Sequence, residues 1–269
     1  MRLRMFTIAA TAVAIGAGGE LPYLPRLAIP MMRAPALVRA GGQPLVAPAP
    51  RARSATESAL EMLRSQVRQT SHPDALRFAF QAYYNYRSAH PAEVRKPYLY
   101  FVDYGLDSRT PRGYVFDMTA LTVVDGPFTV AHGRGSDVDA DGIPTRFTSR
   151  EGSNATSLGL FLAEGTYDFS GKTGGHRYSS IGLRLKGLSG RFNSTAMERG
   201  VVVHGAPYVT PDKAGRSEGC PAMEQSRAQR LIPQLGNGAL VYLFSPRDPT
   251  WMREEPWAHG TGARMAAAD

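Results

Sequence analysis

The feature that most constrains the fold is a series of short apolar runs, rich in β-branched and aromatic residues, that begins after Lys96 and continues to Phe244. Glycine, aspartate and asparagine separate these runs, which is typical of strands joined by turns. This part of the chain therefore predicts a mainly β domain, with a hairpin turn at Asp125-Gly126. We expect its strands at residues 98–104, 114–118, 121–124, 128–131, 158–163, 181–185, 201–204 and 239–244.

Helical periodicity replaces the strand pattern ahead of this domain. Between residues 55 and 95, apolar side chains recur at spacings of three and four, with an interruption near Ser71 to Pro73: Leu60, Leu63, Val67, Leu76, Phe80 and Tyr83. This spacing predicts a short helical pair that packs on the main domain. The same spacing after Cys220 predicts one further helix that extends to Leu235.

The first 54 residues divide into two segments. Residues 1–19 begin with Arg2 and Arg4, continue through an apolar run and end in small residues, which is the layout of a secretory signal peptide. If uncleaved, this segment would act as an N-terminal membrane anchor, although its apolar run is shorter than the roughly 20 residues of a spanning helix. Residues 20–54 are proline-rich and predict a flexible linker. We expect export to the periplasm or cell envelope, a catalytic domain at 96–249 and a tail at 250–269.

The charge pattern limits the classes of partner. A formal net charge of +8 comes from arginines scattered along the chain, without zinc-finger spacing or an aromatic RNA-binding motif. We therefore do not expect nucleic acid as a partner. A cationic surface favours an anionic polymer or a membrane face. A basic surface without any partner is the alternative.

Cys220 is the only cysteine, so the chain cannot form an intramolecular disulfide. A lone thiol in an exported protein calls for an explanation, and a buried, inert cysteine is one. The residues around Cys220 favour a different explanation, a reactive thiol. The string VVVHGAPY at 201–208 puts His204 on a predicted strand, and GRSEGCPA at 215–222 puts Cys220 on a loop. Because the thiolate is the nucleophile, a base must take its proton, and His204 is the expected base.

Pro221 suits the first position of a helix, which would place Cys220 at the N-cap, near the positive end of the helix dipole. We expect the backbone N–H groups of Glu218, Gly219 and Cys220 to converge near the sulfur as an oxyanion hole. Gly219 makes such a close approach sterically feasible.

The spacing of one histidine and one cysteine is not specific by itself, but the full string of residues around them is specific. It resembles the murein L,D-transpeptidase catalytic-domain family, the YkuD-like enzymes, whose signature is a strand-borne His-Gly or His-Ser followed by Ser-x-Gly-Cys. The resemblance covers about residues 97–245 and includes the upstream strings HGRGS (132–136), SLG (157–159) and LRLKGL (183–188). It implies a β-rich catalytic domain, a sandwich or partly open barrel, without a metal or organic cofactor.

The resemblance also implies a thioester mechanism on the peptide stems of peptidoglycan. Cys220 would attack the carbonyl of the third stem residue, usually a diamino acid, and expel the terminal D-Ala; an amine of a second stem or of a protein would then take the acyl group. Carried over by position, Cys220 is the nucleophile, His204 the base, and Gly205 the residue whose backbone carbonyl orients the imidazole. Ser217 and Gly219 match the small residues of the loop.

Two positions depart from the family pattern. Glu218 stands where many members have His or Lys, and Ala222 stands where many have Arg or Asn. Arg216 could supply the missing carboxylate-binding fork. Other candidates for substrate contact are His132, Arg134, Ser217 and Tyr208.

Several alternatives remain open from the sequence. Water could resolve the same thioester, which would make the protein an L,D-carboxypeptidase or endopeptidase, or the domain could bind murein without catalysis. A zinc site has enough ligands but no tight spacing among them: His132, His176, His204, Asp137, Asp139 and Asp141. The stretch from Asp137 to Gly142 resembles the start of a calcium loop, but Thr148 stands where the bidentate glutamate is expected.

Overall fold

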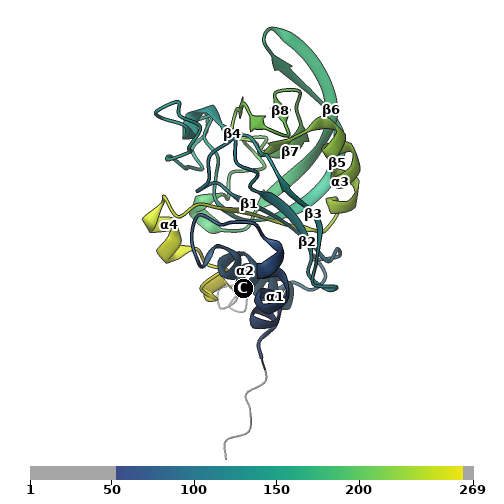
Figure 1. The fold of residues 1–269 in the computed structure, drawn as a ribbon, viewed down its shortest axis with the longest axis vertical. Helices are drawn as coiled ribbons and strands as arrows, with labels where there is room; N and C mark the ends of the chain where they lie inside the picture. Colours follow the sequence, from purple (N-terminus) through teal and green to yellow (C-terminus); the bar gives the residue numbers. More distant parts are fainter. Residues whose placement is uncertain (1–52, 263–269) are drawn as a thin grey trace, which may run out of the picture. The chain divides into compact units, whose positions relative to one another are not determined.

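A computed structural model describes residues 53–262 of the chain. The predicted signal peptide, the predicted linker up to residue 52, and residues 263–269 lie outside the described residues. Within them, one eight-stranded sheet runs through the domain in the order β11-β7-β6-β5-β12-β1-β2-β3 (Figure 1). The predicted mainly β fold is confirmed. In the described part of the chain this sheet stays open, with β11 and β3 as its edges.

The strands divide between this sheet and two small two-stranded sheets, β10-β4 and β8-β9. Their bounds are β1 Tyr98–Asp103, β2 Gly113–Asp117, β3 Thr122–Phe128, β4 His132–Gly133, β5 Gly159–Thr173, β6 His176–Gly187, β7 Val202–Gly205, β8 Val209–Thr210, β9 Lys213–Ala214, β10 Arg216–Ser217, β11 Ala222–Met223 and β12 Leu240–Phe244. In the large sheet, β1 pairs in parallel with β12, and β11 in parallel with β7.

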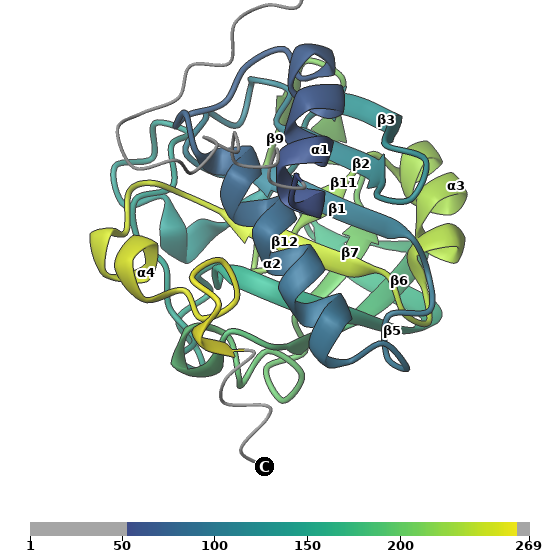
Figure 2. The same ribbon diagram turned by 90° about the horizontal axis from the view of Figure 1, so that it is seen from below.

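The predicted helical pair is present as α1 (Ala55–Leu63) and α2 (Ala75–Ala89). The Ser54 hydroxyl accepts a hydrogen bond from the Glu57 amide and so caps α1. Figure 2 shows α2 lying across β12 and β1, which it contacts. Its apolar side buries Phe80 and Tyr83. This cover explains why β12 is apolar throughout: all five of its residues are buried.

The other helices flank the sheet. α3 (Gln225–Leu235) packs against β6 and β7, and α4 (Pro249–Glu254) follows β12. Short 3₁₀ turns occur at Arg64–Gln66, Arg134–Ser136 and Gly190–Phe192. In the described range, none of these helices has the length and apolarity to cross a membrane.

The predicted hairpin turn at Asp125-Gly126 is wrong. β3 continues through both residues because it pairs with β2 on either side of them, at Phe116↔Val123 and Gly113↔Phe128, with a bulge between. Gly126 adopts a φ of 136° there. The chain reverses earlier, between β2 and β3, where Leu121 has a φ of 53°.

β5 and β6 form a hairpin much longer than the predicted strands at 158–163 and 181–185. They pair without further interruption from Thr166↔Leu183 to Thr173↔His176, and Gly174 and Gly175 turn the chain with positive φ. Figure 1 shows this hairpin projecting beyond the rest of the sheet. The outer part was not predicted, because its residues alternate between exposed and half-buried and lack an apolar run.

The predicted tail is in part folded. The Asp248 carboxylate accepts hydrogen bonds from the amides of Thr250 and Trp251, which caps α4. Trp251 and Trp257 are both buried. Up to residue 262, the C-terminal segment is therefore part of the domain's core.

Candidate active site

A pocket of about 880 Å³ brings together the residues that the sequence analysis singled out. His204 and Cys220 both line it, together with Arg134, Tyr208, Arg216, Ser217 and Glu218. Phe169 and Tyr178 add the inner part of the β5–β6 hairpin as a wall. The predicted nucleophile and base, 16 positions apart in sequence, therefore face one cavity.

Strand pairing brings these two residues together. β7 carries His204 opposite Gly182 of β6, and on its other side β11 places Ala222 opposite His204. Cys220 lies two residues before Ala222, at the entry to β11. The parallel β7–β11 pairing therefore fixes how the cysteine loop approaches the histidine strand.

The His204 ring is held in one tautomer. Its Nδ1 lies 3.0 Å from the Gly205 carbonyl oxygen. Because a carbonyl only accepts, Nδ1 carries the hydrogen, and Nε2 is free to take a proton. The Phe169 ring stacks on the imidazole at a centroid distance of 4.2 Å. Burial lowers the pKa of His204 to about 4, against the opposing effect of the Gly205 carbonyl, so the ring is a neutral base at neutral pH.

Cys220 is half-buried and lines the pocket. The Val202 amide donates to Sγ at 3.5 Å. Burial raises the pKa of the thiol; the Val202 amide and the Arg199 guanidinium act in the opposite direction, and Glu218 adds to the rise. At neutral pH the pocket is therefore lined by an un-ionised thiol and a neutral imidazole.

The predicted helix N-cap at Cys220 is wrong. The residues after Pro221 form β11, and α3 begins at Gln225 with Glu224 as its N-cap. Ala222 and Met223 stay extended because they pair with β7. Cys220 is therefore separated from the first residue of α3 by β11 and does not cap that helix.

Ser217 shapes the cysteine loop from inside. Its hydroxyl donates to the Cys220 carbonyl at 2.6 Å and accepts from the Gly219 amide at 3.2 Å. Gly219 has a φ of 121°, which favours glycine. Because its amide is already bonded, Gly219 is not the free oxyanion donor that we predicted. The amides of Glu218 and Cys220 remain the predicted donors.

His132 does not line the pocket, which contradicts its predicted contact with substrate. Its side chain is fully buried between Arg112 and Asp137. Arg112, also fully buried, donates from Nη2 to His132 Nδ1 at 2.8 Å, so the ring hydrogen sits on Nε2, 3.5 Å from Asp137. Burial and the Arg112 charge lower the pKa of His132. The residue is buried because Ser217 pairs with Gly133 and brings β4 beneath the cysteine loop.

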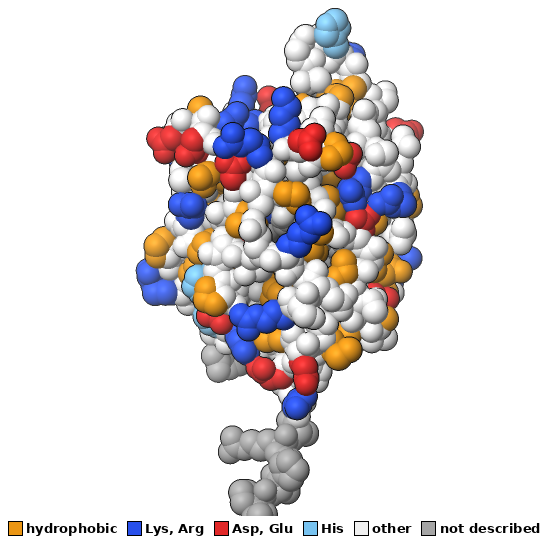
Figure 3. Space-filling model, in the orientation of Figure 1, with side chains coloured by type: hydrophobic (Ala, Val, Ile, Leu, Met, Phe, Trp, Pro, Cys, Tyr) orange, Lys and Arg blue, Asp and Glu red, His pale blue; other side chains and the backbone are white. Residues whose placement is uncertain are grey.

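Arg216 is not the free carboxylate-binding fork that the sequence indicated. Its guanidinium is paired with the buried Asp137 carboxylate. Arg134 and Glu218 face each other at 3.4 Å, both largely exposed. Figure 3 shows basic and acidic side chains intermingled on the face of the molecule that carries β4. Tyr208, half-buried, meets Tyr178 edge to face at a centroid distance of 6.3 Å.

A family profile described as the L,D-transpeptidase catalytic domain matches residues 67–244, which is more than half of the 269 residues. The chain belongs to this family. The match confirms the family to which the motifs around His204 and Cys220 pointed.

Comparison with solved structures found several L,D-transpeptidases. An L,D-transpeptidase from Mycobacterium smegmatis has 15% sequence identity and a TM-score of 0.35, over 55% of this chain and 58% of that one. One from Stackebrandtia nassauensis has 14% identity and a TM-score of 0.34, over 64% and 69%. One from Xylanimonas cellulosilytica has 18% identity and a TM-score of 0.33, over 55% and 61%. The chain thus spans less than two thirds of the mycobacterial and Xylanimonas proteins. No curated protein matched.

Within this L,D-transpeptidase domain, the acidic loop has a structural role. The Asp137 carboxylate accepts hydrogen bonds from the amides of Asp141 and Gly142 and pairs with Arg216. Across residues 53–262, no three His, Cys, Asp or Glu side chains come together as a metal-binding group. The zinc and calcium alternatives therefore have no assembled ligand set there.

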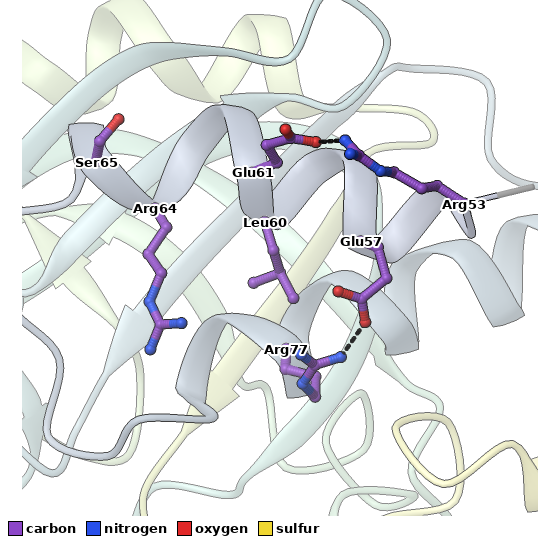
Figure 4. A pocket seen from close by; sticks show the side chains of 7 residues that line it. All are labelled: Arg53, Glu57, Leu60, Glu61, Arg64, Ser65 and Arg77. Atoms are coloured by element: carbon purple, nitrogen blue, oxygen red, sulfur yellow. Dashed lines mark hydrogen bonds and ion pairs between the residues drawn. The ribbon is translucent and has the colours of Figure 1, made fainter. Parts of the chain in front are cut away.

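A second hollow, of about 770 Å³, lies over the two N-terminal helices of the domain (Figure 4). Its carboxylates are already matched with arginines: Glu57 faces Arg77, and Glu61 faces Arg53. These side chains are exposed, and exposed ion pairs contribute little to stability. Unlike the first pocket, this hollow is not lined by a cysteine and a histidine.

The sequence analysis missed three residues of the site: Phe169 on the hairpin, Arg112 beneath His132, and Arg199 just before β7. Phe169 is in a stretch that was not expected to be a strand. Arg112 and Arg199 are among many scattered arginines in the sequence, and only the structure shows that Arg112 is buried and that Arg199 is half-buried in the pocket. No local pattern would have identified them.

Proposed function

We propose that this chain is an exported peptidoglycan L,D-transpeptidase that is acylated on Cys220 by a tetrapeptide stem. One observation supports this most: the lone thiol shares a pocket with a histidine whose Nδ1–H is fixed by the Gly205 carbonyl. That arrangement leaves Nε2 as the acceptor for the thiol proton. Membership of the family favours peptidoglycan stems as the substrate.

In the first half-reaction, Cys220 Sγ attacks the carbonyl carbon of the third stem residue while its proton passes to His204 Nε2. The amides of Glu218 and Cys220 would hold the oxyanion. The tetrahedral intermediate collapses with cleavage of the C–N bond, and the amine of the leaving D-Ala takes the proton from His204. The product is a thioester on Cys220.

In the second half-reaction, an amine of another stem attacks the thioester and gives a proton to His204 Nε2. Cleavage of the C–S bond releases the crosslinked peptide, and His204 returns the proton to the sulfur. Water in place of the amine would give an L,D-carboxypeptidase or endopeptidase. The pocket is open and polar and would admit both nucleophiles.

The test is incubation of the purified protein with a disaccharide tetrapeptide, followed by mass spectrometry of the protein and the products. We expect a thioester adduct on Cys220, release of D-Ala and a dimeric muropeptide. Cys220→Ser should release no D-Ala at the same enzyme concentration. Release of D-Ala without a dimer, even with an added amine acceptor, would favour the carboxypeptidase. Binding without any release would favour a silent murein-binding domain.

Export is a separate part of the proposal, supported by the signal-like composition of residues 1–19. Fractionation of bacteria that express the full chain should place it outside the cytoplasm. A chain that stays in the cytoplasm with residues 1–19 intact would contradict export. A mature protein that remains with the membrane would indicate an uncleaved anchor.

A further inference from the structure

Arg199 places a positive charge in the catalytic pocket. Its guanidinium lines the cavity with Cys220 and His204 and is half-buried. Nη1 donates to the Thr148 carbonyl at 3.2 Å and to the Ser157 hydroxyl at 2.7 Å; Nη2 donates to the Ser153 hydroxyl at 3.3 Å and to the Ala155 carbonyl at 2.9 Å. All of these acceptors are neutral oxygens.

The charge of Arg199 is therefore fixed in place but not neutralised. Among residues 53–262, no carboxylate oxygen lies within 4.0 Å of its guanidinium nitrogens. Arg216 and Arg134, which also line the pocket, do have acidic partners: Arg216 pairs with Asp137, and Arg134 faces Glu218. A half-buried charge without a counter-ion acts on its neighbours more strongly than an exposed or paired one.

This charge lies against the residue that precedes the nucleophile. A Cβ added to Gly219 would lie 3.0 Å from the Ala155 carbonyl oxygen and 3.7 Å from Arg199 Nη2. The guanidinium thus packs beneath the turn that presents Cys220. Cys220 does not cap α3, which starts only at Gln225.

We propose that Arg199 supplies the positive charge that stabilises the Cys220 thiolate while His204 takes the thiol proton. Each Nη nitrogen has two hydrogens, and all four are used by the neutral acceptors. Arg199 therefore acts through its electric field and does not bind substrate through its Nη groups, which makes it a positioning residue. Its charge lowers the pKa of the thiol, in the direction opposite to burial.

This inference rests on the proposed function, in which Cys220 is the nucleophile. It can be tested without turnover, because the chain has one cysteine and any thiol signal belongs to it. We would follow the rate of iodoacetamide labelling and the ultraviolet absorbance of the thiolate against pH, in wild type, Arg199→Gln and Arg199→Lys. Arg150→Gln is the control, because it removes an equal charge from an exposed side chain of the segment, residues 148–157, to which Arg199 donates its hydrogen bonds.

We expect Arg199→Gln to raise the pH midpoint of the thiolate by about one unit. Labelling below the midpoint should slow about fourfold, because the more basic thiolate is also more nucleophilic and offsets part of the tenfold loss. Arg199→Lys, which keeps the charge, should stay closer to wild type, and Arg150→Gln should match wild type. An unchanged midpoint in Arg199→Gln would overturn the inference.

If Arg199→Gln fails to fold, Arg199→Met, which also removes the charge, takes its place: a rise of about one unit in the midpoint supports the charge effect, and an unchanged midpoint overturns it. Release of D-Ala from the disaccharide tetrapeptide is measured separately. A shifted midpoint in a protein that releases no D-Ala would sink the proposed function and leave this inference standing. Release of D-Ala by wild type together with an unshifted midpoint in Arg199→Gln would overturn this inference and leave the proposed function standing.

Discussion

At the scale of single residues, the site combines two groups that burial keeps uncharged. Burial moves the pKa of the Cys220 thiol up and that of the His204 imidazole down, which disfavours a resting thiolate–imidazolium pair. In the proposed reaction, the thiol proton would therefore move to His204 in step with attack on the substrate. This differs from a site with a preformed thiolate, and the difference can be measured.

The first prediction concerns the acid side of the pH profile. As the proposed base, His204 must be unprotonated, and its pKa is lowered to about 4. Activity is therefore present above that pH and is lost as pH falls through about 4. We expect acylation of Cys220 by the tetrapeptide, followed by intact-protein mass, to keep most of its rate at pH 5. A half-maximal rate near the ordinary histidine pKa of about 6.5 would contradict this.

The second prediction concerns the glycine that supports the cysteine loop. A Cβ on Gly133 would lie 2.3 Å from the Asn154 carbonyl oxygen and 2.7 Å from the Gly219 Cα, and neither backbone can move aside cheaply. We expect Gly133→Ala to lose about 1–3 kcal/mol of unfolding free energy in urea and to label more slowly at Cys220. Gly165→Ala is the control, because its Cβ would meet nothing within 4 Å. Equal stability of the two variants would show that Gly133 is not tightly packed.

Sequence reasoning worked at residue scale where one local string carried the information. The predicted contact between the His204 ring and the Gly205 carbonyl is present, and the small loop residues Ser217 and Gly219 pack as such residues must. It failed where a residue's surroundings come from distant parts of the chain. His132 was expected at the substrate, but Arg112 and Asp137 enclose it from both sides.

At the scale of elements, strand pairing decides what the sequence left ambiguous. A strand was expected at Val201 to His204, and β7 runs from Val202 to Gly205. Pro221 indicated a helix start, but Ala222 and Met223 instead pair with the edge of β7 as a strand. The Asp125-Gly126 pair indicated a turn, but β2 continues to pair on both sides of it. In both places, pairing with a neighbouring strand determines the local structure, and a single sequence does not show which strand that neighbour is.

The long β5–β6 hairpin leads to the third prediction. Phe169 on β5 stacks on the His204 ring and shields it from water. Phe169→Ala should hydrate the imidazole and raise its pKa from about 4 towards its ordinary value, so that the acid limb of Cys220 acylation moves to higher pH.

The matched control is Asp168→Ala, which changes an exposed neighbour on the opposite face of the same strand. Histidine ring signals in NMR spectra would report the pKa directly. If the acid limb of the pH profile does not move in Phe169→Ala, the sheet alone excludes water from the His204 ring.

At the scale of the whole molecule, the domain is closed by a segment that the sequence analysis assigned to a tail. Asn85 of α2 donates to the Trp257 carbonyl at 2.7 Å, and Ser189 donates to the buried Glu255 carboxylate at 2.6 Å. The segment after β12 therefore joins α2 to the sheet. Nothing in its short, polar sequence indicates burial, because its two tryptophans are too few to show a period.

The last prediction tests this closure. Trp251 is fully buried and lies within 6.1 Å, centroid to centroid, of the rings of Phe78, Tyr242 and Phe244. Trp251→Ala removes the contact among α2, β12 and α4, and we expect it to lower the free energy of unfolding by about 3–5 kcal/mol. Arg253→Ala, on the same helix but exposed, should change it by less than about 0.5 kcal/mol.

Urea unfolding followed by the fluorescence of Trp257, the one tryptophan left in Trp251→Ala, measures the effect. Because Trp251 does not line the catalytic pocket, Cys220 in the folded variant should label with iodoacetamide at the wild-type rate. A stability loss without a labelling change would show that the C-terminal segment supports the fold alone. Faster or slower labelling at low urea would instead show that the segment also holds the sheet in the register that brings Cys220 to His204.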